Sequence, residues 1–347
     1  MNINEVAKKF NISENKLRFY EKKGLIKPKR NNKNGYREYT EKDLVDIQTI
    51  LTYRILEISI EEIRELLNKD KFEKNNINNI YKQWILVNNK IHKYRLIQNS
   101  LKEVIDLSFK DFKSDEMNKL LIDTGEKVGS ILKITDNWND KWNFDDWAEN
   151  YDISVLNNTG SIDIFNNYNI VLNEVYKNSI NQLPIDGYVL EIGVGTGELA
   201  SKYLKNSIKF IGVDQSINML KRAKQKYLDL NLFIGEFLKL PFDSNSFDRI
   251  VTTYAFHHLK FYEKEMALIE MLRVLKENGK IIIGDMMFES KGKKNDLFKT
   301  LSLSQIKEIE DEYYLIIEEF AKILDKYKLK YSSVKIDKLM YILIIEN

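Results

Sequence analysis

The stretch Val189-Leu190-Glu191-Ile192-Gly193-Val194-Gly195-Thr196-Gly197 decides the fold of the C-terminal half of this chain. Its apolar start predicts a strand, and the three glycines predict a tight turn before a helix over 199–205. A second apolar strand, 210–213, ends at Asp214. Glycines allow positive φ and close backbone approach to a ligand, and an acid at the end of the second strand can accept hydrogen bonds from ribose hydroxyls. The stretch therefore predicts a nucleoside-binding α/β domain.

The spacing of the glycines separates two classes of cofactor. The loop reads Gly-x-Gly-x-Gly with Glu198 next, whereas a dinucleotide loop uses Gly-x-Gly-x-x-Gly to bring a helix N-terminus onto a pyrophosphate. A further acid, Glu191, precedes the loop, and Glu236 ends a third apolar strand where it could accept from an adenine amino group. Together these acids favour a ligand with a ribose, an adenine and a cationic tail, and S-adenosylmethionine fits that description.

Later landmarks complete a resemblance. A fourth strand is expected over 247–253, followed by His257-His258, and a fifth over 281–283. The set resembles the class I S-adenosylmethionine-dependent methyltransferases, which have an α/β Rossmann-like fold, from about residue 147 to 288. The small-molecule branch that includes the ubiquinone and menaquinone methyltransferases is the most similar. After residue 288 we expect a helical insertion over 296–328, then two strands near 331–336 and 339–345 that suit the final antiparallel pair of this fold.

The resemblance implies a set of cofactor-binding residues. Glu236 stands where the family more often has Asp, while Val194 and Glu198 stand where small residues are common. The implied cofactor-binding residues are Tyr151, Glu191, Gly193, Gly195, Gly197, Asp214, Gln215, Met219, Glu236, Phe237 and Thr253.

Catalysis needs little beyond alignment, because a sulfonium already has a good leaving group. A base is needed only where the acceptor holds a proton, and His257 is the candidate because the ordinary pKa of histidine suits proton transfer. The alternative is that His257 and His258 simply end the fourth strand. No metal site is predicted.

The N-terminal segment carries clear helix signals. Ser13, Thr40 and Ser59 are candidate N-caps, and Asn34-Gly35 predicts a hairpin with a type I′ turn. Residues 1–40 hold eleven lysines and arginines against four glutamates, although the whole chain carries only +2. This local excess is the electrostatic footprint of DNA binding, and a solvated basic face is the alternative.

The motifs 17–26 and 34–39 resemble the MerR family of transcription regulators through about residue 68. The resemblance implies a winged helix-turn-helix in which the Ser13 helix enters the major groove, with Asn15 and Lys16 as candidates for base contacts. A winged helix used only for protein contacts is the alternative. The phosphate contacts that the resemblance implies are Arg18, Tyr20, Tyr36 and Arg37.

A long helix is expected to follow. Residues 76–107 lack proline and glycine, and apolar residues recur at alternating steps of four and three, which predicts a coiled coil and a homodimer. The alternative is a helix packed on the C-terminal domain of its own chain. The seam consists of Ile80, Trp84, Val87, Ile91, Tyr94, Gln98, Leu101 and Ile105.

The predicted organisation is therefore multidomain. An all-α winged helix-turn-helix (1–74) and a coiled-coil helix (75–108) precede a linker (109–145) and a class I methyltransferase domain (146–347). Trp138, Trp142 and Trp147 crowd together at the edge of this last domain, either as packing or as the roof of a ligand pocket.

Composition narrows the function. The absence of cysteine excludes disulfides, thiolate metal sites, iron–sulfur clusters and cysteine nucleophiles. No membrane span or signal segment is seen, so a cytoplasmic protein is expected. The three prolines are never adjacent, which excludes the Pro-Pro-Tyr loop of base-modifying methyltransferases.

We therefore expect a regulator that binds double-stranded operator DNA and methylates a small molecule with S-adenosylmethionine. The alternative is a regulator whose methyltransferase-like domain only senses S-adenosylmethionine or another metabolite as its effector.

Overall fold

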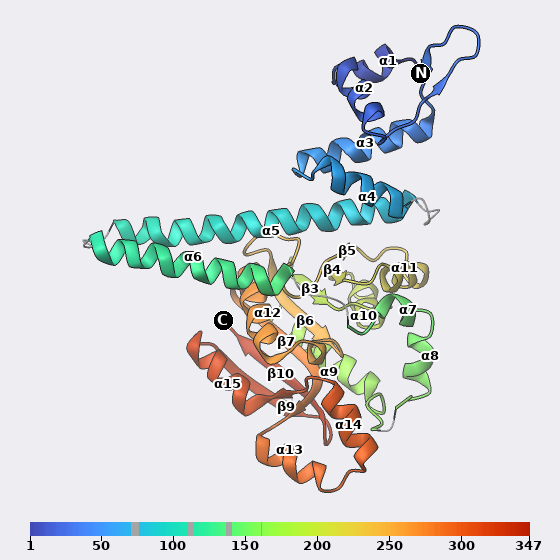
Figure 1. The fold of residues 1–347 in the computed structure, drawn as a ribbon. Helices are drawn as coiled ribbons and strands as arrows, with labels where there is room; N and C mark the ends of the chain where they lie inside the picture. Colours follow the sequence, from blue (N-terminus) through green and yellow to red (C-terminus); the bar gives the residue numbers. More distant parts are fainter. Residues whose placement is uncertain (71–75, 110–113, 137–140, 161) are drawn as a thin grey trace. The chain divides into compact units, whose positions relative to one another are not determined.

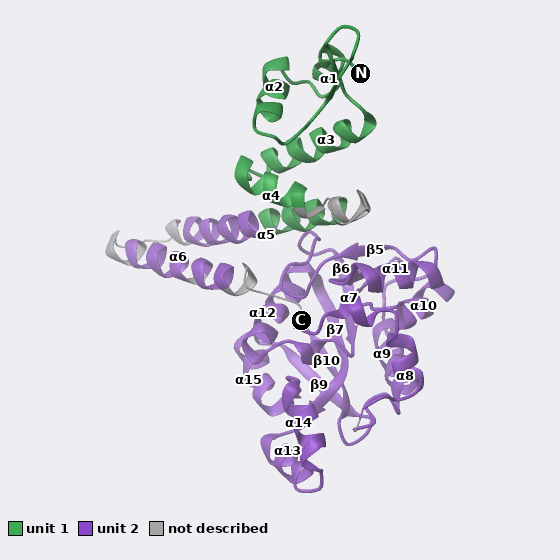
Figure 2. Cartoon of the chain, turned by 45° about the vertical axis from the view of Figure 1, so that its right-hand side comes forward, with its two compact units in different colours: residues 1–91 green, residues 92–347 purple. Residues whose placement is uncertain are grey.

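The computed structural model describes residues 1–70, 76–109, 114–136, 141–160 and 162–347. The chain forms two compact units, residues 1–91 and 92–347 (Figure 2). The division falls inside the long helix α5 (Asn76–Ser108), whose bounds agree with the helix predicted over 76–107. Within the described ranges, no helix combines the length and the apolar character needed to cross a bilayer.

The first unit begins with a helix-turn-helix and a small wing (Figure 1). Each predicted N-cap is confirmed: the hydroxyls of Ser13, Thr40 and Ser59 accept from the backbone N–H three residues later. The elements before α5 are α1 (Ile3–Lys9), α2 (Glu14–Lys22), β1 (Lys29–Arg30), β2 (Arg37–Glu38), α3 (Glu41–Ile55) and α4 (Ile60–Asp70).

The hairpin between β1 and β2 has a longer turn than predicted. The strands pair antiparallel, and Asn31 N donates to Tyr36 O, which closes a four-residue turn. Gly35 alone in this turn has positive φ, whereas a type I′ turn needs two such residues. Asn31 directs the chain instead, because its side chain accepts from Lys33 N and its carbonyl from Gly35 N, each at 2.8 Å.

The segment 109–145, predicted as a linker, contains the helix α6 (Ser114–Asp136). Its half-buried residues Leu120, Thr124, Val128 and Ile131 recur at steps of four and three, so one face of the helix is covered. Both views show α6 turning back beside the end of α5 (Figures 1 and 2). Gly125 and Gly129 both lie within this continuous helix.

The second unit is a doubly wound α/β domain, as predicted. Its strands run in the order β5-β4-β3-β6-β7-β10-β9, with β10 antiparallel to both of its neighbours and β8 added beside β7. The strands are β3 (Tyr188–Ile192), β4 (Lys209–Asp214), β5 (Leu232–Ile234), β6 (Phe247–Thr253), β7 (Leu275–Phe288), β8 (Leu315–Ile316), β9 (Lys330–Lys335) and β10 (Met340–Glu346).

Helices cover both faces of this sheet. Leu190 and Ile283 pack with residues of α12 and α15 in one core cluster, whereas Gly284 faces Val171 and Val175 of α9. Neighbouring residues of a strand point to opposite faces, so α9 and α12 lie on opposite sides. The helical elements are α7 (Phe144–Trp147), α8 (Tyr151–Leu156), α9 (Tyr168–Ile180), α10 (Glu198–Lys205), α11 (Ile217–Lys226), η1 (Phe256–His258), α12 (Phe261–Val274), α13 (Lys291–Phe298), α14 (Leu303–Asp311) and α15 (Ile317–Lys326).

Candidate functional site

The glycine-rich loop after β3 is held against the end of β4. The backbone N–H groups of Gly193 and Val194 donate to the carbonyl of Val213 at 2.8 and 3.0 Å. Gly193, Gly195 and Gly197 all have positive φ, which residues with a side chain adopt only at a cost. At Gly193 an added Cβ would also lie 2.6 Å from Ala255 Cβ. Backbone geometry and close packing together require glycine here.

The acid at the end of β4 is oriented by backbone donors. Gly195 N donates to Asp214 Oδ2 and Ser216 N donates to Asp214 Oδ1, both at 2.8 Å. An added Cβ at Gly195 would meet nothing within 4 Å, so the loop is open on that side. The carboxylate therefore lies beside an open backbone surface, where a polar ligand could approach both.

Two further acids lie in desolvated positions. Glu191 is 1% exposed, and its Oε2 has no hydrogen-bond partner among the described residues. Burial and the nearby Asp214 raise the pKa of Glu191 well above its ordinary value. Burial also raises the pKa of Glu236 to about 7, although Lys239 opposes this from 3.6 Å. An unpartnered buried carboxyl oxygen is costly, and it is a feature that a cationic ligand would relieve.

These elements border one cavity. Nine of the eleven predicted cofactor residues line it; the other two are the buried Glu191 and Gly197, the N-cap of α10. Tyr254, at the end of β6, adopts φ +51°, a rare backbone conformation for an aromatic residue and one that turns the chain at the cavity wall. The lining residues are Phe144, Tyr151, Ile192, Gly193, Gly195, Asp214, Gln215, Met219, Gly235, Glu236, Phe237, Thr253, Tyr254, Ala255, His258 and Leu259.

An aromatic segment covers part of this cavity. Phe144 and Tyr151 line it, and Trp147 packs edge-on against Tyr151 with ring centroids 5.1 Å apart. Asp145 holds the segment in place, because its Oδ1 accepts from Ser216 Oγ at 2.6 Å and it also accepts from the backbone of α11. Of the tryptophans predicted to be either packing or a roof, Trp142 and Trp147 are not among the lining residues, although their neighbours Phe144 and Tyr151 are, and Trp138 lies outside the described residues. Asp145 had no signal in the sequence, since its partner lies 71 residues away.

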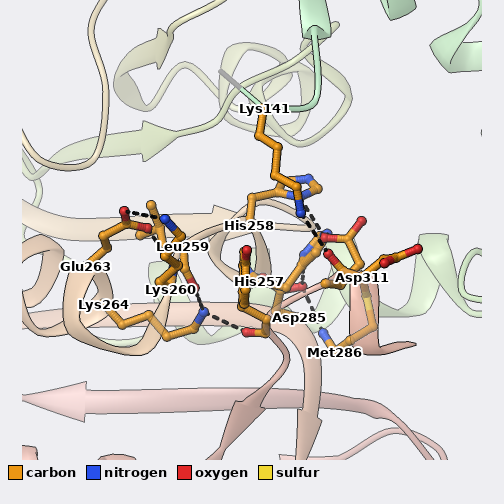
Figure 3. A network of polar contacts seen from close by, with 12 residues as sticks. Lys141, His257, His258, Leu259, Lys260, Glu263, Lys264, Asp285, Met286 and Asp311 are labelled. Atoms are coloured by element: carbon orange, nitrogen blue, oxygen red, sulfur yellow. Dashed lines mark hydrogen bonds and ion pairs between the residues drawn. The ribbon is translucent and has the colours of Figure 1, made fainter. Parts of the chain in front are cut away.

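The two histidines differ in their position relative to the cavity. His257, the predicted base, is 5% exposed, and its Nδ1 lies 2.7 Å from Asp285 Oδ1 (Figure 3). It is not among the lining residues; the neighbouring His258 is. His258 Nδ1 lies 3.1 Å from Glu312 Oε2, while burial and the adjacent His257 lower the pKa of His258 to about 4.

Sequence reasoning missed both acidic partners of these histidines. Asp285 carries a detectable signal, because it is a single charge inside the apolar stretch 281–288. Glu312 carries none, since it follows a helix rich in charged residues. Lys141 adds a cation above this region: its Nζ lies 4.4 Å from the centroid of the Trp142 ring, and that ring lies 4.9 Å from His258.

The predicted DNA contacts are mostly on the surface of the first unit. Ser13, Asn15, Lys16 and Arg18 are exposed along α2, and Tyr36 is 72% exposed on the wing. Arg37 is half-buried and donates to Glu21 Oε2 at 2.6 Å, which ties the wing to α2.

Tyr20, predicted to hold a phosphate, is instead 1% exposed in the core of this unit. It lies three residues after Leu17 on the same face of α2, and helical spacing turns both side chains inward. No phosphate could reach its hydroxyl in this conformation.

Comparisons with known proteins agree with both parts of the chain. Residues 1–70 match the MerR HTH family regulatory proteins, and residues 190–283 match a methyltransferase domain. An uncharacterized methyltransferase of Oceanobacillus iheyensis is 35% identical over 205 residues, which cover 58% of this chain and 93% of that protein. One of Alkaliphilus oremlandii is 33% identical and is covered over 94% of its length, with 58% of this chain. Among solved structures, the YcgJ protein from Bacillus subtilis matches with a TM-score of 0.41 at 20% identity, over 51% of this chain and 97% of that one.

Proposed function

The chain belongs to a family of methyltransferases and begins with a MerR-type helix-turn-helix domain, and from this premise we propose that it binds S-adenosylmethionine and methylates a small molecule. One observation carries the proposal: the open glycine loop, the oriented Asp214 and the buried Glu191 oxygen lie together at the ends of β3 and β4. The arrangement fits a cationic nucleoside, because it offers carboxylates and close backbone approach together.

Different residues of the cavity would contact different parts of the cofactor. Asp214 accepts from the ribose hydroxyls, Glu236 from the adenine amino group, and Met219 packs on the adenine ring. Glu191 and Tyr151 face the amino-acid end. S-adenosylmethionine, when bound, supplies a methyl group on a cationic sulfur with a thioether as leaving group. The chain contributes mainly orientation and exclusion of water, which are large terms for a transfer of this kind.

The polarity and charge of the other lining residues indicate which class of methyl acceptor the cavity favours. Phe144, Tyr254, Ala255 and Leu259 are apolar or aromatic, and the lining residues, all within the described part of the chain, include no lysine or arginine. An anionic acceptor would lie near Asp214 and Glu236 with no lysine or arginine among these lining residues, and it would be disfavoured. The acceptor is therefore a small, largely apolar, neutral or cationic molecule. His257 is not among the lining residues, so the proposal does not depend on it as a base.

The first unit provides the DNA-binding half of the function. Exposed polar residues of α2, with Tyr36 on the wing, would contact the major groove and flanking phosphates. The seam of α5 leaves Ile80, Ile91 and Leu101 exposed by 63%, 40% and 54%. A second copy of the helix would cover these side chains, and a dimer would present two reading heads to a palindromic site.

The proposal is tested by calorimetry and by product analysis. The purified full chain should bind S-adenosylmethionine, and incubation with methyl-labelled cofactor and a panel of neutral and cationic apolar acceptors should give a labelled product. Binding without transfer to any acceptor, with and without bound DNA, would favour the alternative of a sensor. Failure to bind the cofactor at all would contradict the proposal.

A further inference from the structure

Three side chains with metal-binding atoms converge beside the cavity. His257 and His258 lie in η1, and Glu312 is the C-cap of α14. One ring nitrogen from each histidine and one oxygen of Glu312 all lie within 4.8 Å of one another. Glu312 Oε2 is 3.1 Å from His258 Nδ1 and 4.0 Å from His257 Nε2.

The ring nitrogen Nδ1 of His257 already has a partner, so only the other ring nitrogen, Nε2, is available to bind a metal ion. Asp285 Oδ1 lies 2.7 Å from His257 Nδ1, and the Asp285 carboxylate also accepts from the backbone N–H groups of Met286 and His257. With Nδ1 turned to the Asp285 carboxylate, the other ring nitrogen of His257, Nε2, lies 4.0 Å from Glu312 Oε2. A carboxylate behind a histidine is the usual outer shell of a metal-bound imidazole.

The second histidine is held rigidly. The ring of His258 lies 3.8 Å from that of His257 and 4.9 Å from both Trp142 and Phe144, measured between centroids. This packing fixes the plane of the imidazole with Nδ1 towards Glu312. Glu312 is 21% exposed, so a small rotation of its side chain can adjust the third ligand.

Asp285 and Glu312 place two carboxylates behind and within the cluster. Their side chains are only 2% and 21% exposed. The buried Lys264 Nζ donates to the backbone carbonyl of Leu259 (Figure 3) and to that of Tyr313. A divalent ion between the imidazoles and Glu312 would compensate the desolvated carboxylates directly.

We propose that His257 Nε2, His258 Nδ1 and the Glu312 carboxylate bind one divalent transition-metal ion, with Asp285 as the outer-shell partner of His257. Two imidazoles and one carboxylate are a known donor set for zinc and ferrous iron. At metal–ligand bonds of about 2.0–2.1 Å, tetrahedral donors stand about 3.3 Å apart. The His258–Glu312 pair meets this spacing, whereas the His257–Glu312 pair, at 4.0 Å, and the two histidine ligand atoms, within 4.8 Å of each other, would have to move inward on metal binding.

The metal site would bind the methyl acceptor, and this role rests on the proposed methyl transfer. Three protein ligands leave a coordination position for an outside donor. His258 is shared between the cluster and the cavity wall, so the position suits an acceptor with an oxygen donor such as a phenol or an enol. Metal binding itself does not depend on that role and can be measured without turnover.

The experiment titrates the metal-stripped full chain with Zn²⁺ by calorimetry and with Co²⁺ by visible absorption. We expect one ion per chain and a cobalt spectrum typical of nitrogen and oxygen ligands. Glu312→Gln and His258→Asn should each weaken Zn²⁺ binding at least tenfold, and Asp285→Asn by about 10–100-fold as an outer-shell change. Glu310→Gln, an exposed acid two residues away, is the matched control and should bind as the wild type does.

The outcomes separate this inference from the proposed function. Retained affinity for S-adenosylmethionine in Glu312→Gln would show that the variant folds, so a loss of Zn²⁺ binding there would support the site. Zn²⁺ binding that is absent, or equal in the wild type and both ligand variants, would overturn it even where the cofactor binds. Failure of the cofactor alone to bind would instead contradict the proposed function.

Discussion

The backbone N–H of Gly195 donates to Asp214 Oδ2 at 2.8 Å, so the glycine-rich loop and the acid at the end of β4 form one structural unit. The same carboxylate accepts from Ser216 N at the start of α11. A single side chain therefore links the turn after β3 to the helix after β4. A ligand that binds Asp214 therefore depends on the position of the loop, because the loop orients this carboxylate.

Removal of this carboxylate should weaken cofactor binding. We expect Asp214→Ala to lower the affinity for S-adenosylmethionine at least about tenfold, because hydrogen bonds to a charged group contribute about 1.5–3 kcal/mol. Calorimetry measures the change. Asp186→Ala, which removes an exposed acid paired with Lys209, serves as the control and should leave the affinity unchanged. Equal affinities in the wild type and Asp214→Ala would show that the cofactor site lies elsewhere.

Two glycines should respond in opposite ways to the same substitution. In Gly193→Ala the new Cβ would lie 2.6 Å from Ala255 Cβ at φ +75°, so we expect a destabilisation of about 1–3 kcal/mol. In Gly125→Ala the Cβ meets nothing within 4 Å inside the helix α6, and a gain of about 0.5–1 kcal/mol is expected. Urea denaturation gives both values. A tolerated Gly193→Ala would mean that the end of β6 can move away from the loop.

Stability should depend on pH through Glu236. Its pKa in the folded chain is about 7 because burial disfavours the ionised form, whereas the ordinary value is 4.5. A raised pKa means that its contribution to stability is present below pH 4.5 and is lost as the pH rises through 7. Glu236→Gln should therefore match the wild type near pH 4.5 and exceed it by up to about 3 kcal/mol at pH 8.

Thermal or urea unfolding of the two proteins across this pH range measures the difference. Glu191 also has a raised pKa, but it is present in both proteins and cancels in the comparison. Glu277→Gln changes an exposed acid of β7 and should show no such divergence from the wild type. Parallel curves for Glu236→Gln and the wild type would contradict the burial of an ionisable group at this position.

The features that could be predicted from the sequence are those set by local backbone geometry. Gly193, Gly195 and Gly197 are required by positive φ, and Asp214 follows directly from the end of a strand. The N-caps of α2, α3 and α4 depend on contacts only three residues apart. Such short-range rules can be read from a single chain. The resemblance to methyltransferases, which rests on these motifs, implied nine of the cavity-lining residues in advance.

The features that could not be predicted depend on contacts between distant elements. Asp145 reaches Ser216, and Glu312 reaches His258, across 71 and 54 residues. Nothing in the composition of α7 or α14 marks these acids among their charged neighbours. The same reason explains Tyr20: its residue type suits a phosphate contact, and only the packing of α2 shows that the side chain is turned inward. The helix α6 continues through Gly125 and Gly129, because glycine lowers helix propensity by only about 1 kcal/mol and a covered face outweighs that cost.

A phosphate contact should be recognisable by its salt dependence. Arg18 is exposed on α2 and pairs with Glu14 at 2.9 Å. We expect Arg18→Ala to weaken binding to all duplex sequences alike and to reduce the slope of log affinity against log salt by about 1. Fluorescence anisotropy at several salt concentrations measures the slope. Lys102→Ala, on an exposed part of α5, should leave it unchanged. A change in base preference would instead make Arg18 a reader of base edges.

Two tyrosines of the first unit offer the same chemical change in opposite environments. Tyr36 is 72% exposed on the wing, so Tyr36→Phe should lose a hydrogen bond to phosphate and weaken DNA binding about two- to tenfold, or about 0.5–1.5 kcal/mol. Tyr20 is 1% exposed, and its hydroxyl has no partner among the described residues. Tyr20→Phe should therefore leave DNA affinity unchanged and stability equal or slightly higher, because a buried unsatisfied hydroxyl is removed.

Anisotropy and urea unfolding of both variants give the comparison. A large loss of DNA affinity in Tyr20→Phe, with unfolding unchanged, would mean that α2 exposes this side chain when it meets the duplex. The buried arrangement seen in the free chain would then be one of two states, and the helix would have to rotate to bind. The packing of Tyr20 with Leu17, Ile47 and Ile50 argues against that rotation, because it would expose much of the core of this small unit at once.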